Sequence, residues 1–249
     1  MTLTSQAHDH RFLPLAGTLN TRDLGGLPVA GGKQTLKGKF LRSDAPFELT
    51  ESDLSALADL PLTTVVDLRQ EMEIQRDVSR LTGRPGIAVH NIAVWGPIEE
   101  ADDEPTDKFD ITAFYIAALN HAPKAFAQIT RILTDAEGTA LFHCTAGKDR
   151  TGLVALLLLE SVGVDRQTII DDFALTHDRI EPLRVRLLAD AEQRGIPRAE
   201  FARLLGATPD LLTPALDHLD KRFGGAVQYL SAAGVSDDTF AALERKLVG

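Results

Sequence analysis

The 249-residue chain carries 26 Lys and Arg against 36 Asp and Glu, which gives a net charge of −10, and 44% of its side chains are hydrophobic. This composition excludes a disordered chain, and the acidic balance argues against a nucleic-acid binder. We expect no membrane span, because no window approaches the ~20 consecutive apolar residues that a span requires. The first residues lack the basic and apolar regions of a signal peptide, so a cytoplasmic location is predicted.

Strands and helices are predicted to alternate in the first part of the chain. Short apolar runs bounded by Gly, Pro or polar residues predict strands over residues 40–41, 63–68 and 89–94. A capping-box pattern and apolar residues at helical spacing predict a helix over residues 50–60. The acidic run over residues 99–110 is predicted to be an exposed loop. This alternation indicates an α/β sheet.

The rest of the chain is predicted to be mainly helical around one further strand. Pro123 begins a predicted helix that Gly138 stops, and a short central strand follows over residues 139–142. Residues 151–162 are apolar nearly all round, which predicts a buried helix. Beyond residue 165 the expected helix starts lie near Pro182, Pro197 and Pro214, the stops near Gly195, Gly206 and Gly224, and the last N-cap at Ser236.

The segment HCTAGKDRTG, residues 143–152, lies between the last predicted strand and the buried helix. It places Cys144 and Arg150 six positions apart around a loop that contains Gly147. Such a loop can point consecutive backbone N–H groups inward and form an anion nest at the helix N-terminus. Phosphate is the natural occupant, and Arg150 would bind two of its oxygens through the guanidinium fork.

Cys144 is the chain's one cysteine, which excludes an intramolecular disulfide, a CxxC redox pair and a zinc site of several thiolates. In an anion nest its thiolate is favoured over its thiol, so we predict a nucleophile whose pKa lies below the usual ~8.5. Thr151 is placed to donate a hydrogen bond to that thiolate or to assist hydrolysis of a phosphocysteine. His143 is expected to order the loop rather than to act as a base.

Two alternative interpretations of the loop are weaker. An inert buried thiol is the commonest fate of a lone cysteine, but it explains neither Arg150 nor Gly147. A nucleotide-binding P-loop requires Gly-Lys followed by Ser or Thr, whereas Gly147-Lys148 is followed by Asp149.

The same segment resembles the H-C-x5-R-[ST]-G motif of cysteine-dependent phosphatases, in the form found in atypical bacterial tyrosine/lipid phosphatases of the PtpB type. Other blocks similar to that family are NTRDLGG at residues 20–26, Arg42-Ser43, Asp67-Leu68-Arg69, Glu73 and, more weakly, Tyr229-Leu230 and Gly234-Val235. The resemblance implies a three-layer α/β/α fold with a central, mostly parallel sheet. We expect a single domain with an α/β core over residues 11–164 and a helical part over residues 165–249.

The resemblance also implies roles for individual residues. The predicted phosphate-binding residues are Thr145, Ala146, Gly147, Lys148, Arg150 and Thr151. Lys148 would contact a second phosphate of the substrate, with a solvated lysine as the equal alternative. Asp67 and Arg69 are expected to buttress the loop, and the predicted supporting residues near the N-terminus are Asn20, Arg22 and Asp23.

The general acid is not given by the usual motif, because the Trp-Pro-Asp loop of better-known tyrosine phosphatases is absent: Trp95-Gly96-Pro97 is followed by Ile98. Asp149 takes this role in proposals for the PtpB-type family, and Asp102 or Asp103 on the acidic loop are the alternatives. Asp149 is favoured because it is fixed close to the phosphate, whereas a mobile loop must close. An ion pair with Lys148 would also explain Asp149.

The predicted reaction is phosphomonoester hydrolysis by double displacement. Cys144 attacks phosphorus, Asp149 protonates the leaving oxygen, and water hydrolyses the phosphocysteine without a metal or cofactor. The substrate is expected to be a phosphorylated protein, foremost at tyrosine and also at serine or threonine, or a phosphoinositide, with inorganic phosphate as product. Two other enzyme classes use similar cysteine loops but fit the sequence less well. Arsenate reductases need resolving cysteines, which this chain lacks, and a rhodanese would not require Arg-Thr-Gly after the loop. A catalytically silent phosphate-binding module is the alternative outside the enzymes.

Overall fold

The computed structural model describes residues 9–94, 110–193, 195, 197–198, 202 and 205–249. Of the predicted acidic loop only Asp110 belongs to these residues, so Trp95, Asp102 and Asp103 lie outside the part described. Asp110 caps the next helix, where its side chain accepts a hydrogen bond from the Thr112 amide at 2.9 Å.

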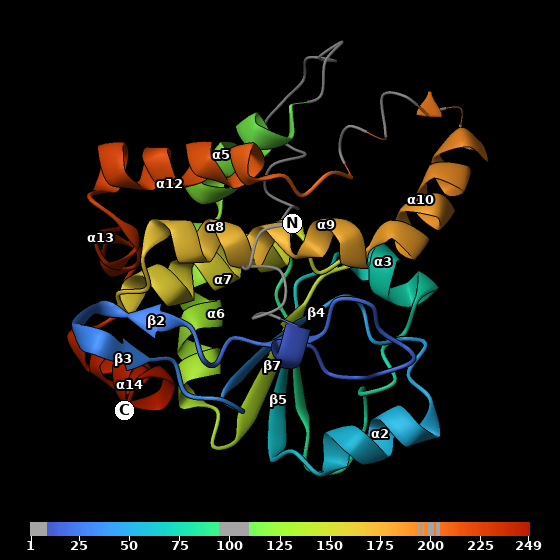
Figure 1. Ribbon diagram of the computed structural model, residues 1–249, viewed down its shortest axis with the longest axis horizontal. Coiled ribbons are helices and arrows are strands. Elements are labelled where there is room, and N and C mark those ends of the chain that lie inside the picture. Colours follow the sequence, from blue (N-terminus) through green and yellow to red (C-terminus); the bar gives the residue numbers. More distant parts are fainter. Residues whose placement is uncertain (1–8, 95–109, 194, 196, 199–201, 203–204) are drawn as a thin grey trace.

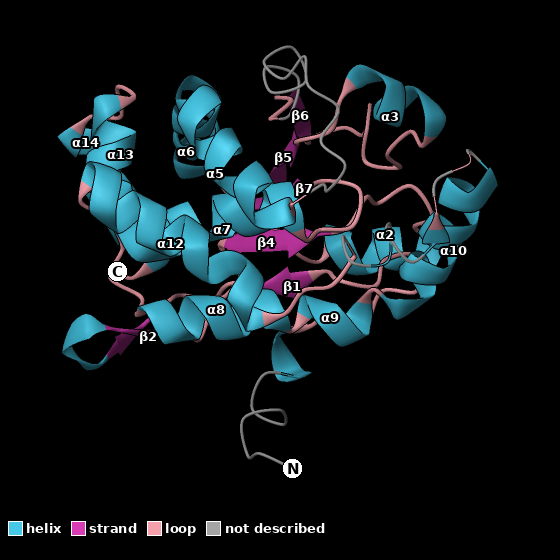
Figure 2. Cartoon of the chain, turned by 90° about the horizontal axis from the view of Figure 1, so that it is seen from above, coloured by secondary structure: helices cyan, strands magenta, loops and turns pink. Residues whose placement is uncertain are grey.

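A five-stranded sheet lies at the centre of the molecule in the order β1, β4, β7, β5, β6 (Figure 2). Its strands are β1 (Arg22–Asp23), β4 (Phe40–Ser43), β7 (Thr139–His143), β5 (Leu62–Asp67) and β6 (Ala88–Asn91). All neighbouring pairs are parallel except β1 with β4. A short hairpin of β2 (Pro28–Val29) and β3 (Lys33–Gln34) stands apart. The predicted α/β fold with a mostly parallel sheet is confirmed.

The two faces of the sheet are covered unequally. Since side chains alternate along a strand, Ala140 and Phe142 of β7 enter a large hydrophobic cluster while Leu141 enters a smaller one. Helix α2 (Glu51–Ala58) covers the smaller cluster, and α5 (Ile111–His121), α6 (Pro123–Asp135) and α7 (Asp149–Ser161) cover the larger one. Figure 1 shows α6 and α7 on one side of the strands and α2 on the other.

Helix α2 begins as the sequence predicts. The Thr50 side chain accepts a hydrogen bond from the Asp53 amide at 3.1 Å, and the Asp53 carboxylate accepts one from the Thr50 amide at 2.8 Å. This reciprocal capping box satisfies two amides that the first helical turn leaves without partners. Pro123 likewise takes the first position of α6, although that helix ends at Asp135, before Gly138.

Helix α7 is buried on all sides, as predicted, from Arg150 to Leu159. It begins at Asp149, two residues earlier than expected, so Arg150 belongs to its first turn. This early start places the arginine at the positive end of the helix dipole, next to the loop that carries Cys144.

The other α-helices in the described part of the chain are α3 (Glu71–Arg76), α8 (Arg166–Ala174), α9 (Thr176–Arg179), α10 (Glu181–Gln193), α12 (Pro209–Phe223), α13 (Ala226–Ala232) and α14 (Asp237–Leu247). Pro182 in the first turn of α10, Gly224 after α12 and Ser236 before α14 stand where predicted. The prediction for Pro214 is wrong: it lies inside α12, because Pro209 takes the first position, where a missing N–H costs nothing.

We propose that the chain forms a single domain. The large hydrophobic cluster joins Phe142 of the sheet with Leu219 of α12 and Leu243 of α14, so the C-terminal helices share the core of the α/β part. Within the described residues, none of the helices has the length and apolar character needed to cross a membrane.

Candidate active site

The loop from Cys144 to Lys148 joins β7 to α7, and its carbonyl groups are held from outside. The Asn20 side-chain amide donates to the carbonyls of Ala146 (3.2 Å) and Gly147 (3.1 Å). Arg42 also donates to the Gly147 carbonyl at 2.9 Å, and the Ala45 amide donates to the Thr145 carbonyl at 3.0 Å. These contacts fix the loop with its oxygens turned toward the neighbouring segments.

The amides of the loop are left available for an anion. In the part of the chain that the structure describes, the N–H groups of Thr145, Ala146 and Gly147 donate to no protein acceptor. Gly147 has a φ of +65°, and a Cβ there would lie 2.6 Å from the Ser43 carbonyl oxygen, so glycine is required. Available amides and outward carbonyls together make the predicted anion nest.

Cys144 begins this loop and is buried. Beside it, His143 is fully buried at the end of β7, and its Nδ1 lies 3.1 Å from the Cys144 carbonyl, to which it donates. Burial lowers the pKa of His143, and the nearby Asp67 carboxylate only partly opposes this. A neutral His143 therefore holds the backbone of Cys144 rather than its sulfur.

Arg150 is paired with Glu73 of α3 through both arms of its guanidinium group. Nη1 donates to Oε2 at 2.6 Å and Nη2 to Oε1 at 2.8 Å, while the Thr145 hydroxyl donates to the same Oε1 at 2.5 Å. Burial raises the pKa of Glu73, but the hydrogen bonds and charge of Arg150 outweigh it and bring the pKa to about 2. Glu73 thus stays ionised and fixes the guanidinium beside the loop.

Asp149 and Lys148 form a second group at the start of α7. The Asp149 carboxylate accepts a hydrogen bond from the Tyr115 hydroxyl of α5 and lies 3.0 Å from Lys148 Nζ. Lys148 is itself buried, with its ammonium group also donating to the Gly206 carbonyl at 2.9 Å. The ion pair that the sequence offered as an alternative for Asp149 is therefore present, and the contact of Lys148 with a second phosphate stays a prediction.

Comparison with known proteins identifies the family. The profile of the tyrosine phosphatase family matches residues 13–249. The chain belongs to the tyrosine phosphatase family. It is accordingly a phosphoric monoester hydrolase, whose loop of available amides, buried cysteine and arginine lies at the carboxyl ends of parallel strands.

Similar phosphatases occur in several bacteria. The chain is 31% identical to a Cupriavidus necator protein with a provisional tyrosine-protein phosphatase name, covering 91% of this chain and 84% of the relative. It is 29% identical to the triple specificity protein phosphatase PtpB of Mycobacterium tuberculosis, and the match covers 94% of this chain and 98% of the relative. The crystal structure of a cysteine-to-serine variant of P. aeruginosa TpbA with phosphotyrosine aligns at a TM-score of 0.33 and 20% identity over 57% of this chain and 70% of that one.

A buried ion cluster holds the phosphatase loop from behind. Asp172 of α8 pairs with Arg11 (2.8 Å), Arg22 (3.1 Å) and Arg42 (2.6 Å), and all four side chains are nearly inaccessible to solvent. Burial raises the pKa of Asp172, but the three guanidinium groups outweigh it and hold the pKa well below its usual range. Arg22 also donates to the side chain and carbonyl of Asn20. The cluster therefore fixes the positions of Asn20 and Arg42, the two side chains that donate to the Gly147 carbonyl.

Replacing Asp172 with asparagine is expected to lower the free energy of unfolding by about 3–5 kcal/mol, because three buried guanidinium groups would lose the carboxylate that they share. Urea denaturation measures this loss. The matched control is Asp217→Asn, which removes the carboxylate of an exposed pair with Arg166 and should leave the midpoint unchanged. Equal midpoints for the two variants would show that the cluster does not stabilise the fold.

The other predicted supporting residues, Asp67, Arg69 and Asp23, make no direct contact with the Cys144 loop. Arg69 pairs with Asp67 at 2.7 Å, and Asp67 Oδ2 lies 3.6 Å from His143 Nε2, so this pair borders the loop through His143. Asp23 accepts hydrogen bonds from the amides of Gly25 (2.8 Å) and Gly38 (2.7 Å). It therefore shapes the turn after β1 and does not touch the loop that carries Cys144.

Thr151 is buried in the first turn of α7, but the predicted hydrogen bond to Cys144 is not formed. Its hydroxyl has no hydrogen-bond partner among the described residues. A hydroxyl in this state can bond to a bound phosphate or to a water molecule, so a part in phosphocysteine hydrolysis stays a prediction.

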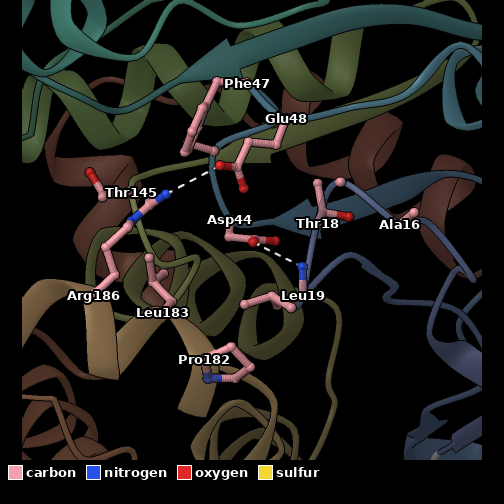
Figure 3. A pocket seen from close by; sticks show the side chains of 12 residues that line it. Ala16, Thr18, Leu19, Asp44, Phe47, Glu48, Thr145, Pro182, Leu183 and Arg186 are labelled. Atoms are coloured by element: carbon pink, nitrogen blue, oxygen red, sulfur yellow. Dashed lines mark hydrogen bonds and ion pairs between the residues drawn. The ribbon is translucent and has the colours of Figure 1, made fainter.

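A surface pocket of about 170 Å³ adjoins the loop at Thr145 (Figure 3). Asp44 lies in its lining and accepts hydrogen bonds from the amides of Leu19 (2.9 Å) and Asn20 (3.0 Å). Burial raises the pKa of Asp44 to about 6. Arg186 of α10 pairs with Glu48 at 3.4 Å in the same pocket, so charged side chains from distant segments line it beside Thr145.

Proposed function

We propose that this phosphatase hydrolyses phosphotyrosine, and more slowly phosphoserine and phosphothreonine, by double displacement. The sulfur of Cys144 attacks phosphorus, and the P–O bond to the leaving group breaks as the S–P bond forms. The loop amides and the Arg150 guanidinium stabilise the equatorial oxygens, where charge accumulates. Asp149 gives its proton to the leaving oxygen. Water then attacks the phosphocysteine and gives a proton back to the Asp149 carboxylate, and the S–P bond breaks to release inorganic phosphate and restore the Cys144 thiolate.

The observation that carries this proposal is the state of the loop around Cys144. Its amides have no protein acceptor in the described part of the chain, its carbonyls are held from outside, and Arg150 is fixed beside it by Glu73. Preorganised donors that await an anion need no rearrangement when the charged transition state forms. A cysteine at their centre supports nucleophilic catalysis rather than simple phosphate binding.

The proposed preference for phosphotyrosine over phosphoinositides rests on Lys148. Its ammonium group is buried and already held by Asp149 and the Gly206 carbonyl, which supports a structural role at the start of α7 over contact with a second phosphate of an inositol head group. The net charge of −10 also disfavours an anionic membrane surface. A cytoplasmic location stays a prediction from the sequence.

The substrate proposal predicts an order of activity. With phosphotyrosine, phosphoserine and phosphothreonine peptides of one sequence and a phosphoinositide panel, kcat/KM should be highest for phosphotyrosine. Release of inorganic phosphate under identical conditions measures all four classes, and vanadate should inhibit each reaction. Faster turnover of a phosphoinositide than of any peptide would overturn the substrate proposal, and a complete lack of turnover, aryl phosphates included, would favour a silent phosphate-binding module.

A further inference from the structure

Tyr115 on α5 is a buried side chain whose hydroxyl reaches the active site. It donates a hydrogen bond to Asp149 Oδ1, and the edge-to-face contact of its ring with Phe173, at 6.3 Å between centroids and 83°, fixes its direction. We propose that Tyr115 is a positioning residue for the general acid: it fixes which oxygen of Asp149 carries the transferred proton and stabilises the carboxylate that remains. This inference rests on the proposed role of Asp149.

The two oxygens of Asp149 have different surroundings. Oδ1 accepts the Tyr115 hydroxyl bond and lies 3.0 Å from Lys148 Nζ, whereas Oδ2 has no donor among the described residues. A carboxylic acid keeps its proton on the oxygen that does not already accept hydrogen bonds. The proton of a protonated Asp149 therefore lies on Oδ2, and Tyr115 holds the group in that orientation.

The hydrogen bond from Tyr115 gains strength as the reaction proceeds. When the proton on Oδ2 passes to the leaving oxygen and the P–O bond breaks, Asp149 becomes a carboxylate. A hydrogen bond to an ionised acceptor is roughly twice as strong as one to a neutral acceptor. Tyr115 thus stabilises the transition state more than the ground state, which is the condition for raising the rate.

The electrostatic surroundings of Tyr115 agree with a hydroxyl that stays protonated and acts as a donor. Burial raises its pKa well above the ordinary value, and the charges of Asp149 and Cys144 raise it further. Since the phenol keeps its proton at every working pH, it donates to Asp149 throughout the reaction and does not itself exchange a proton with the substrate.

The test is Tyr115→Phe, with kcat/KM measured on aryl and alkyl phosphates of increasing leaving-group pKa. The proposal predicts about a 10-fold loss for poor leaving groups, which need protonation, and little loss for p-nitrophenyl phosphate, which does not.

The matched control is Tyr229→Phe, because Tyr229 is the chain's other tyrosine and is equally buried, but its hydroxyl donates to the Leu119 carbonyl at 2.7 Å. This variant should keep the leaving-group dependence and pH profile of the native enzyme. In an Asp149→Asn background, Tyr115→Phe should cause no further change in leaving-group dependence.

Three results would overturn the inference: no loss in Tyr115→Phe, a loss that is uniform over all leaving groups, or a further steepening of the leaving-group dependence when Tyr115→Phe is added to the Asp149→Asn background. Cys144→Ser separates this inference from the proposed function. Activity that survives Cys144→Ser contradicts the phosphocysteine route itself. If Cys144→Ser is inactive but Asp149→Asn keeps the native leaving-group dependence, the phosphocysteine route stands. Asp149 is then not the general acid, and Tyr115 has no acid to position.

Discussion

Replacing Cys144 with serine is expected to lower turnover of any phosphomonoester by roughly 10⁴-fold or more. At neutral pH a serine hydroxyl is protonated, and the loop offers no base to activate it, since His143 is buried and bonded to the Cys144 carbonyl. Phosphate binding should persist, because the loop amides and Arg150 are unchanged. Steady-state kinetics measures the first effect and titration calorimetry with inorganic phosphate the second.

The paired measurement distinguishes chemistry from folding. A Cys144→Ser protein that binds phosphate as the native enzyme does, but does not turn over substrate, has lost only its nucleophile. Substantial remaining turnover in this variant would mean that the reaction does not need the Cys144 thiolate, and this would contradict the phosphocysteine route.

Arg150→Lys is expected to lower kcat by about 10²- to 10³-fold, the usual cost of removing a preorganised transition-state donor. Lysine keeps the positive charge and can still pair with Glu73, but it cannot offer two parallel N–H groups to phosphate oxygens. The loss should appear mainly in kcat, since the fork is most complementary to the spread-out charge of the transition state.

Arg166→Lys is the control for this variant. Arg166 lies at the start of α8, on the surface, and pairs with Asp217 and Asp220. Its replacement should leave kcat unchanged. If Arg150→Lys and Arg166→Lys have the same activity, the guanidinium fork takes no part in catalysis.

The sequence predicts the loop well because everything that defines the loop is contiguous. Cys144, Gly147 and Arg150 stand within seven residues, between an apolar strand and an apolar helix, and local rules are enough to place them at a helix N-terminus. Only the first residue of α7 differs, because Asp149 and Arg150 join the helix before its apolar pattern begins.

The side chains that hold the loop could not be assigned from the sequence in the same way. Glu73 reaches Arg150 from α3, Asp172 reaches Arg42 from α8, and Tyr115 reaches Asp149 from α5. Each pair is separated by at least 34 positions, and only packing brings its members together. Glu73 is one of the positions where the sequence resembles the family, but the resemblance alone does not predict that it pairs with Arg150.

Lys148 shows how burial changes the role suggested by a charge. Its place beside Arg150 suggests a second cation for phosphate, yet the structure buries it between Asp149 and the Gly206 carbonyl. A buried ammonium group needs such partners, since an unpaired one would be costly. The surroundings of Lys148 depend on the segment before α12, which no local pattern around the loop reveals.

The central claim is that the phosphoryl group is carried on Cys144 during turnover. The most direct measurement mixes the native enzyme with saturating aryl phosphate, stops the reaction during steady turnover by rapid denaturation in detergent at neutral to alkaline pH, where the S–P bond survives, and maps the phosphoryl group by peptide mass spectrometry. We predict a phosphoryl group on the peptide of Cys144, at its sulfur, and none in Cys144→Ser. A phosphoryl group on another residue, or turnover with no covalent phosphoenzyme, would contradict the account.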